Sequence, residues 1–463
     1  MKTKILTMFL EKIWVILPVI ILMVIFACAA PKKEAPVKNE PPQSFVVHPE
    51  WSRNATIYEV NIRQFTPEGT FNAFREHIPR LKKMGVDILW LMPVNPIGEK
   101  FRKGKLGSYY SISDYEAINP EFGNMDDLKR LVNEAHQAGM KVILDWVASH
   151  TSWDHVWITQ HPEYYKKDTL GNMVSPFDWS DVAQLDYDKK EVRDAMTETL
   201  KFWINEADID GFRCDVAWMM PVDFWDTVRT ELDRIKPVFM LAEAEGPQYH
   251  TKAFDMSYAW ELHHLMNAIA KAKKNVRALD SLMLKQDTLY PADAYRMLFT
   301  SNHDENSHQG TEFERMGAGS VCMAVLTATL PGMPLIYSGQ ESAFNERLRF
   351  FDKDTIIWND YRLEPFYQKL FALKHAYQPL WNGSWGGPLQ RINTSADTSV
   401  FAFIREKEGD RIFVMANLTG DVKECALQGA AFKGNYKEWF TEEEIALKKG
   451  AVVRLKPWEY KVY

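Results

Sequence analysis

The chain has 463 residues, of which 46% are hydrophobic and 25% are charged, with a net charge of -7 at pH 7 and a pI near 6.0. This length allows two or three domains with a large core, and the acidic balance argues against a nucleic-acid-binding protein, which would usually carry a basic face. Three cysteines lie far apart in apolar segments: Cys214, Cys322 and Cys425. No CxxC or His-rich spacing accompanies them, so we expect buried free thiols.

The first 48 residues differ from the rest of the chain. Lys2 and Lys4 precede an apolar run at residues 13–27, as in a signal segment, and the run ends in Phe-Ala directly before Cys28. This ending resembles a bacterial lipoprotein signal, so we expect residues 1–28 to be a signal peptide and Cys28 to be lipidated. An uncleaved membrane anchor and an ordinary secretory signal are the alternatives. Residues 29–48, rich in Pro and Lys, predict a disordered linker. The protein would then be exported and lipid-anchored at a bacterial membrane, in the periplasm or at the cell surface.

Between residues 49 and 382 the sequence alternates strand-like and helix-like segments. The strand-like segments span residues 56–65, 86–94, 141–148, 210–217, 238–244, 254–260, 294–304 and 333–339. Residues 86–94 form a continuous apolar run, as in a strand buried on both faces. The helix-like segments include residues 71–84, 125–138, 191–207, 221–235 and 365–377, and Gly85 marks a helix end. Eight such units predict an α/β fold, a (β/α)8 TIM barrel over residues 49–382.

One interruption and one change of pattern complete the predicted organisation. Residues 149–188, rich in His, Trp, Tyr and Asp, are too long for an ordinary loop, so we expect a short inserted subdomain B after the third strand, over the active-site face. Residues 383–463 contain short alternating runs, which predict a C-terminal all-β sandwich domain. We expect this domain to pack on the barrel helices; starch binding is the alternative.

The segment Asp210-Gly211-Phe212-Arg213-Cys214-Asp215-Val216-Ala217 predicts a short buried strand with two charges. Side chains alternate along a strand, so Arg213 and Asp215 share one face and Cys214 points the other way. An arginine beside a buried carboxylate lowers its pKa and keeps it ionised, as a nucleophile requires. A structural ion pair is the alternative interpretation of this segment alone.

Polar residues occur at the ends of four predicted strands. In chain order they are Asp145 with Ser149 and His150, then Arg213 and Asp215, then Glu243 and Glu245, then Asn302, His303 and Asp304. The C-terminal ends of barrel strands converge on one face, and isolated buried carboxylates are costly. These side chains therefore predict a shared catalytic pocket.

Two facing carboxyl groups, one ionised and one protonated, are the machinery of glycoside hydrolysis. Arg213 favours the ionised form of Asp215. Glu243 ends an apolar run, has no basic neighbour in sequence and is predicted to share a face with Glu245, so we expect its pKa to be raised. Glu245 is the alternative candidate for the acid.

Four motifs lie on the predicted strands in chain order: DWVASH at 145–150, GFRCDVAW at 211–218, LAEAEG at 241–246 and FTSNHD at 299–304. Together they resemble the motifs of the α-amylase family, glycoside hydrolase family 13, and the resemblance extends over nearly the whole mature chain. Supporting matches are VNP at 94–96, GSYYSISDY at 107–115, QLDYD at 184–188 and GMPLIYSGQE at 332–341. Any one would be weak, but all occur in the expected order.

The resemblance implies a role for each catalytic candidate. Asp215 would be the nucleophile that forms a covalent glucosyl intermediate with net retention. Glu243, which directly follows Leu241-Ala242 as the family's acid does, would protonate the leaving oxygen and then activate water. Asp304 would bind the sugar hydroxyls and distort the ring.

Further residues are implied to bind or support the substrate. Arg213 would orient Asp215, and His150 and His303 would bind hydroxyls of the same sugar. Tyr110 would be a stacking platform, and Asp145 would support the floor of the site.

Two positions depart from the family pattern. Ser149 stands where an Asn, often a calcium ligand, usually precedes the histidine, so no metal site is assigned, although a structural calcium elsewhere is left open. Trp218-Met219 replaces the Lys-His pair of many α-amylases, which favours relatives that process maltodextrins. Trp218 would place an aromatic surface on the leaving-group side of the substrate-binding site.

These observations predict a retaining α-glucan hydrolase that acts on α-1,4-linked glucose in starch or maltodextrins and needs no cofactor for its chemistry. A transglycosylase or isomerase of the same fold, acting on maltodextrins, maltose or trehalose, is the nearest alternative. A non-catalytic glucan-binding protein is a second, and the presence of Asp215, Glu243 and Asp304 together argues against it.

Overall fold

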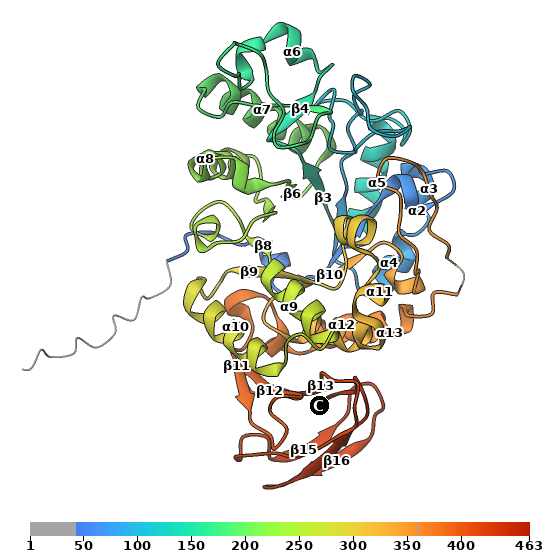
Figure 1. Cartoon of the computed structure of the whole chain (residues 1–463), viewed down its shortest axis with the longest axis vertical. Coiled ribbons are helices and arrows are strands. Elements are labelled where there is room, and N and C mark those ends of the chain that lie inside the picture. The colour runs from blue at the N-terminus through green and yellow to red at the C-terminus, as the bar shows by residue number, and fades with distance from the viewer. Residues whose placement is uncertain (1–42, 359) are drawn as a thin grey trace, which may run out of the picture. The chain divides into compact units, whose positions relative to one another are not determined.

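The computed structural model describes residues 43–358 and 360–463. Its centre is a closed barrel of eight parallel strands in the order β1-β10-β9-β8-β7-β6-β3-β2 (Figure 1). The strands are β1 (Ile57–Val60), β2 (Ile88–Leu91), β3 (Lys141–Trp146), β6 (Gly211–Cys214), β7 (Phe239–Ala242), β8 (Met256–Tyr258), β9 (Tyr295–Phe299) and β10 (Met333–Tyr337). The predicted (β/α)8 barrel is confirmed.

Helices connect the barrel strands. They are α2 (Ile62–Phe65), α3 (Phe71–Arg75), α4 (Ile78–Met84), α5 (Met125–Gln137), α7 (Lys190–Ala207), α8 (Val222–Asp233), α9 (Trp260–Ala270), α10 (Val276–Leu289), α11 (Glu312–Met316), α12 (Ser320–Thr329) and α13 (Glu364–Ala376). Helix α5 begins at a capping box on Asn124 and buries an i, i+3, i+4, i+7 face of Leu128, Leu131, Val132 and Ala135. Gly85 ends α4 with φ of +100°, a conformation that only glycine adopts easily.

The predicted strands are longer than the observed ones. The predicted strand 56–65 ends at Val60, and α2 follows, because Ile62 and Phe65 bury the same side of one helical turn. The predicted strand 294–304 likewise ends at Phe299. In both cases the buried, strand-like composition continues into the loop that carries the polar residues at the end of the barrel.

Alternating side chains of the strands form two separate cores. Inward-facing residues, among them Ile57, Trp90, Leu241, Tyr258 and Phe299, fill the barrel interior. Outward-facing residues such as Phe212 and Cys214 pack with the helices in a larger cluster. The interior of the barrel is therefore filled by packed side chains and is not a channel.

The chain enters the fold at the N-terminal ends of the strands. The amide of Phe45 donates to the carbonyl of Thr251, and His48 Nδ1 lies 2.8 Å from the buried Asp255 Oδ1, directly before β8. Burial lowers the pKa of His48, but Asp255 and Asp293 outweigh burial and raise the pKa to about 9. The predicted linker therefore extends too far at its end, because residues 45–48 are bound to the barrel.

The remainder of the predicted N-terminal segment, including the proposed lipidation site Cys28, lies outside the described residues. Within residues 43–358 and 360–463, no helix combines the length and the apolar character that crossing a bilayer requires.

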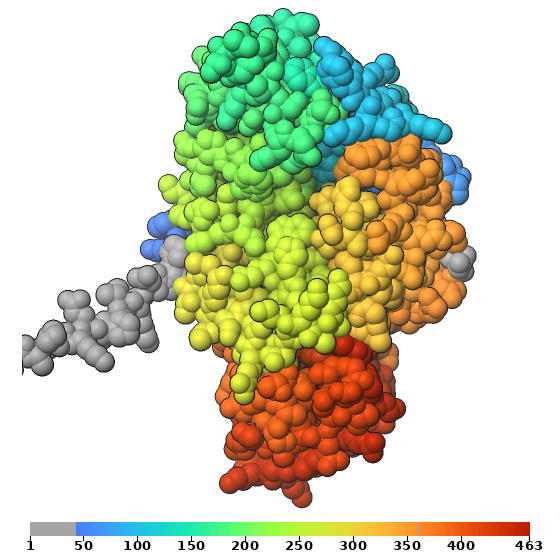
Figure 2. Space-filling view, viewed as in Figure 1, coloured from blue at the N-terminus to red at the C-terminus, as the bar shows by residue number. Residues whose placement is uncertain are grey.

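The insertion after β3 is built on a small antiparallel ribbon. Strand β4 (His150–Ser152) pairs with β5 (Val182–Gln184), and α6 (Val156–Gln160) lies between them in sequence. The amide of Glu99 donates to Asp154 Oδ2, which joins the insertion to the loop after β2, and Leu106 donates to the carbonyl of Phe351. Figure 2 shows these blue, green and orange segments against one another.

The C-terminal region consists of antiparallel sheets. One has the order β11-β12-β13-β18, and β14-β17 and β15-β16 form pairs. The strands are β11 (Leu389–Ile392), β12 (Val400–Lys407), β13 (Asp410–Asn417), β14 (Lys423–Ala426), β15 (Gly434–Lys437), β16 (Glu444–Leu447), β17 (Val452–Leu455) and β18 (Tyr460–Val462). One face of the larger sheet packs within the domain and the other joins the main cluster; buried Arg405 donates to the carbonyls of Thr329 and Leu330. This arrangement supports a packing role.

Candidate active site

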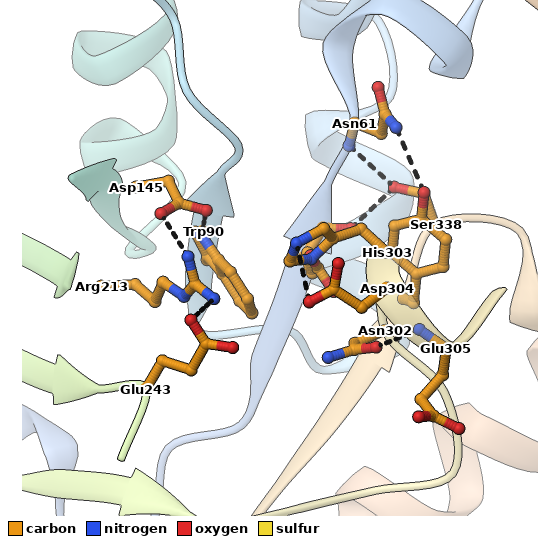
Figure 3. Close-up of polar contacts among 12 residues, drawn as sticks. Asn61, Trp90, Asp145, Arg213, Glu243, Asn302, His303, Asp304, Glu305 and Ser338 are labelled. Atoms are coloured by element: carbon orange, nitrogen blue, oxygen red, sulfur yellow. Dashed lines mark hydrogen bonds and ion pairs between the residues drawn. The ribbon is translucent and has the colours of Figure 1, made fainter. Parts of the chain in front are cut away.

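One buried arginine joins three carboxyl groups from neighbouring strands. Arg213 Nη1 lies 2.7 Å from Asp145 Oδ1 and 2.9 Å from Asp215 Oδ1, and its Nη2 lies 2.8 Å from Glu243 Oε2. Asp145 is on β3, Arg213 on β6, and Glu243 directly follows β7 (Figure 3). The three strands are adjacent in the barrel, so sequence positions almost 100 residues apart meet at a single guanidinium.

The close approach of β6 and β7 depends on Gly211. Its φ is +150°, and a Cβ atom there would lie 1.9 Å from the carbonyl oxygen of Phe239 on β7. A side chain at this position would push the two strands apart. Gly211 therefore keeps Arg213 and Glu243 within ion-pair distance.

Burial dominates the electrostatics of the carboxyl cluster. It raises the pKa of Asp215 well above its usual range, although the Arg213 guanidinium lowers it, and it raises the pKa of Glu243 in the same way. The sequence-based expectation of a lowered pKa for Asp215 is therefore wrong, because burial, together with the nearby carboxyl groups, outweighs the effect of the Arg213 guanidinium. Two such groups beside one cation titrate as a pair, so one is protonated while the other is ionised.

Glu243 and Glu245 have different environments. Glu243 Oε2 accepts a hydrogen bond from the Val216 amide at 2.8 Å, and the side chain lines the cavity. Glu245 Oε1 pairs with Arg296 at 2.8 Å and does not line it. The prediction that the two glutamates share a face is wrong, because β7 ends at Ala242 and strand alternation stops there.

His303 and Asp304 follow β9 and lie across the site from Arg213 (Figure 3). His303 Nε2 is 2.7 Å from the Tyr110 hydroxyl and 3.4 Å from Asp304 Oδ2. The Tyr110 hydroxyl in turn donates to Asp145 Oδ2 at 2.9 Å. The ring of Tyr110, implied to be a stacking platform, is itself stacked on His303 and is mostly buried.

His150 lies on β4 at the start of the insertion. Its Nδ1 is 2.7 Å from Ser149 Oγ, and its Nε2 is 3.0 Å from the Tyr110 carbonyl oxygen. Burial lowers the pKa of His150 to about 4, so the ring is neutral at physiological pH. It lines the cavity as a neutral hydrogen-bonding group.

The residues around Ser149 do not fit a calcium ion. The Ser149 hydroxyl is bound to His150, and the nearby Asp181 is paired with Lys103 at 2.9 Å. Across residues 43–358 and 360–463, no group of three or more His, Cys, Asp or Glu side chains could hold a metal ion. Cys214, Cys322 and Cys425 are buried free thiols, as predicted.

The cavity has a volume of about 390 Å³, within the usual range for small-molecule sites. Three segments wall it: Lys103 and Tyr110 from the loop after β2, Trp179 and Asp181 from the insertion, and Phe350 from the loop after β10. Asp215, Glu243 and Asp304 all line it, together with His150 and His303. The three predicted catalytic carboxyl groups thus meet in one cavity.

The remaining predicted residues lie beneath or beside the cavity. Asp145 and Arg213 are fully buried under it, so they contact a substrate only through the side chains that they hold. Trp218 is 51% exposed, and its ring centroid lies 5.9 Å from that of Phe177, which is 67% exposed. The ring of Phe177 in turn packs against that of Trp179 in the cavity wall, with a centroid separation of 5.3 Å.

Sequence reasoning missed several residues of the site. Glu59 on β1 is fully buried with its Oε1 2.5 Å from His303 Nδ1, and a carboxylate between Tyr58 and Val60 in a predicted strand was the available signal. Phe350, Lys103 and Trp179 come from long loops without periodicity, and nothing in the sequence places them.

Comparison with known proteins agrees with this geometry. A model of the alpha-amylase catalytic domain family matches residues 42–173 and 172–382. The structure of an alpha-amylase from Lactobacillus plantarum has a TM-score of 0.79 and 31% sequence identity, covering 89% of this chain and 99% of that one. The alpha-amylase MalA of Haloarcula japonica is 27% identical over 392 residues, 80% of this chain but only 56% of MalA. An alpha-1,4-glucan:maltose-1-phosphate maltosyltransferase of Rhodospirillum rubrum is 33% identical over 240 residues, which are 46% of this chain and 35% of that protein.

Proposed function

The chain belongs to the alpha-amylase family, and from this we propose that it is a retaining hydrolase that cleaves α-1,4-glucosidic bonds in starch and maltodextrins. The observation that carries the proposal is the single guanidinium of Arg213, which contacts both Asp215 and Glu243. Contact with one cation favours the short carboxyl separation of retaining enzymes, about 5–5.5 Å, over the about 6.5–9.5 Å of inverting ones.

The first half of the reaction uses both carboxyl groups. Asp215, as carboxylate, attacks the anomeric carbon of the donor glucose and forms a glucosyl ester as the glycosidic C–O bond breaks. Glu243, as carboxylic acid, gives its proton to the leaving oxygen. Burial raises the pKa of Glu243, which favours the protonated form that this step needs.

The second half reverses the proton transfer. Glu243, now a carboxylate, removes a proton from water, and the water oxygen attacks the anomeric carbon and releases Asp215. Asp304, His303 and His150 line the cavity and would bind the hydroxyls of the donor glucose throughout. Two inversions at the same carbon give net retention.

Trp218 supports a second proposal on the leaving-group side of the cavity. Trp218 lies two residues after Val216, whose amide donates a hydrogen bond to Glu243. As the proposed acid, Glu243 must face the leaving sugar, so Trp218 lies near that side of the cavity. Phe177 contacts Trp218 and is held exposed with φ of +51°, a backbone conformation that phenylalanine rarely adopts. Exposed aromatic faces suit the apolar faces of sugars, so this pair would bind glucosyl units beyond the scissile bond.

The product anomer tests the reaction. Maltoheptaose and starch would be digested in parallel with wild-type protein, Asp215→Asn and the control Glu245→Gln, and new anomeric protons followed by NMR. We expect α-anomers first, from wild type and Glu245→Gln but not from Asp215→Asn. Initial β-anomers would contradict the mechanism, and activity lost in Glu245→Gln but kept in Asp215→Asn would reassign the carboxyl groups.

A transglycosylase is the second candidate, and the similarity to a maltosyltransferase over 46% of the chain favours it. The same glucosyl ester would then be attacked by a sugar hydroxyl in place of water. Digesting maltotriose in the presence of labelled glucose separates the two activities, because only transfer incorporates the label into longer products.

For location we propose export and lipid anchoring through Cys28, on the sequence pattern alone. Labelling cells with a radioactive fatty acid should mark the wild-type protein but not Cys28→Ser, and the variant should leave the membrane fraction. An unlabelled wild-type protein would exclude the lipid anchor.

A further inference from the structure

Glu59 is a buried carboxyl group that the reaction scheme leaves without a role. It lies on β1 with no exposed surface, 244 residues from His303 in sequence. Its Oε1 is 2.5 Å from His303 Nδ1, and its Oε2 has no hydrogen-bond partner among the residues that the structure describes. A carboxylate is costly to bury, so a single short contact with an active-site histidine calls for an explanation.

The hydrogen bonds around His303 determine which of its ring nitrogens carry a proton. The Tyr110 hydroxyl has one proton and donates it to Asp145 Oδ2. Its oxygen is therefore free to accept the bond from His303, so His303 Nε2 carries a proton. Nδ1 faces Glu59, and the proton between them belongs either to an imidazolium or to a neutral carboxylic acid.

The charges around His303 favour the imidazolium. Asp304 Oδ2 lies 3.4 Å from Nε2 and Glu59 lies at Nδ1, so a carboxyl group faces each ring nitrogen. Burial and Arg213 lower the pKa of His303, but Asp304 and Glu59 outweigh them and raise it to about 9. Tyr110 contacts the ring as a neutral hydroxyl, with its own pKa raised by burial.

We propose that Glu59 is a positioning residue that holds His303 as an aligned imidazolium, and through it orients Asp304 and Tyr110 for the donor sugar. This inference rests on the proposed function, since it deepens the role of the same cavity. The buried chain of contacts runs from Glu59 through His303, Tyr110 and Asp145 to Arg213. Glu59 thus connects the two halves of the site without touching the substrate.

A charged His303 would act on the substrate in two ways. The imidazolium attracts the Asp304 side chain and orients it, so that Asp304 accepts hydrogen bonds from sugar hydroxyls. The charge also strengthens the hydrogen bond that His303 Nε2 donates to the Tyr110 hydroxyl, which fixes Tyr110 in the cavity wall. Glu59→Gln keeps the shape of the side chain but removes the charge that holds the proton on Nδ1.

The direct test is NMR of selectively ¹⁵N-histidine-labelled protein, which contains 12 imidazoles. The resonances of His303 are identified by their absence in His303→Gln. In wild type we expect both ring nitrogens of His303 to be protonated at pH 7, and in Glu59→Gln the ring to be neutral at this pH. This measurement needs no substrate, so its result stands even if no glucan is hydrolysed.

Kinetics supply the second readout. For maltoheptaose, Glu59→Gln should lower kcat/KM at pH 7 by about ten- to a hundredfold, as for the loss of an outer partner that orients a functional side chain. The loss of kcat/KM in Glu59→Gln should become smaller as pH falls toward 5, because His303 then takes up its proton from solvent. Glu59→Asp, which keeps the charge, should recover part of the activity and the pH profile of wild type.

Asp255→Asn is the matched control. It also removes a buried carboxylate that pairs with a histidine, His48, but at the opposite end of the barrel. It should lower stability and leave the resonances of His303 and the pH profile unchanged. A neutral His303 in wild type would overturn the proposal, as would an imidazolium that persists in Glu59→Gln, or equal effects of Glu59→Gln and Asp255→Asn on the pH profile.

Discussion

Replacing Arg213 with methionine tests the central cluster most directly. Methionine keeps an apolar stem of similar length but removes the one cation that contacts Asp145, Asp215 and Glu243. Arg213 and Asp145 are fully buried, and the side chains of Asp215 and Glu243 are only 10% and 13% exposed. Water therefore cannot replace the guanidinium.

The expected loss of stability follows from the buried charges. Removing one partner of a buried ion pair costs about 3–5 kcal/mol, and the three pairs share Arg213, so their costs do not add. Asp215 and Glu243 already have raised pKa values, and without Arg213 both rise further. Protonation then relieves part of the uncompensated charge, which keeps the loss near about 3–5 kcal/mol at neutral pH.

The sign of the pH dependence distinguishes this explanation from a packing defect. A carboxyl group with a raised folded pKa destabilises the native state above its unfolded pKa, and this penalty disappears as pH falls toward that value. The difference between Arg213→Met and wild type should therefore be large at pH 8 and smaller at pH 5.

Urea unfolding followed by tryptophan fluorescence at pH 5, 6, 7 and 8 measures these differences. Arg296→Met is the control, because Arg296 is buried but pairs with a Glu245 side chain that is 33% exposed and can be hydrated. Its effect should vary less with pH. A loss for Arg213→Met that is the same at every pH would refute the argument.

Three further predictions concern binding, pH and backbone geometry. Trp218→Ala should raise KM for maltoheptaose about two- to tenfold, as for the loss of one stacking contact, and leave maltotriose hydrolysis unchanged. Equal effects on both substrates would exclude an aromatic platform that contacts only the longer one. The ion pair of His48 with Asp255 should stabilise the fold fully below the unfolded pKa of 6.5, and this stabilisation should be lost as pH rises through about 9. In His48→Gln the midpoint of urea unfolding should therefore depend less on pH over this range. A pH dependence equal to that of wild type would contradict the ion pair. Gly211→Ala should lower the free energy of unfolding by about 2 kcal/mol or more, since its Cβ would lie 1.9 Å from the Phe239 carbonyl oxygen. The control Gly420→Ala, whose Cβ would meet no atom beyond its chain neighbours closer than 3.9 Å, should change the stability little. Similar shifts in melting temperature for the two variants would show that β6 relaxes freely.

The sequence predicted the barrel well because its strands are buried on both faces. Continuous apolar runs such as residues 86–94 have few other stable environments in a soluble fold. The convergence of Asp215, Glu243 and Asp304 was predictable for a related reason, since parallel strands place their C-terminal ends together.

What the sequence could not give depends on contacts between distant residues. Arg213 has one carboxylate near it in sequence but three in space. The pKa of Asp215 is raised mainly because the folded chain buries this carboxyl group, and burial outweighs the effect of Arg213. The partner of His303 lies 244 residues away at Glu59. Glu245 was misplaced because the strand ends two residues earlier than alternation assumes.

The attachment of residues 45–48 distinguishes the two ends of the barrel. These residues bind at the N-terminal ends of the strands, beside Asp255, whereas the cavity lies at the C-terminal ends. Residues 45–48 therefore stabilise the barrel at the end opposite the cavity and leave the approach to Asp215, Glu243 and Asp304 uncovered.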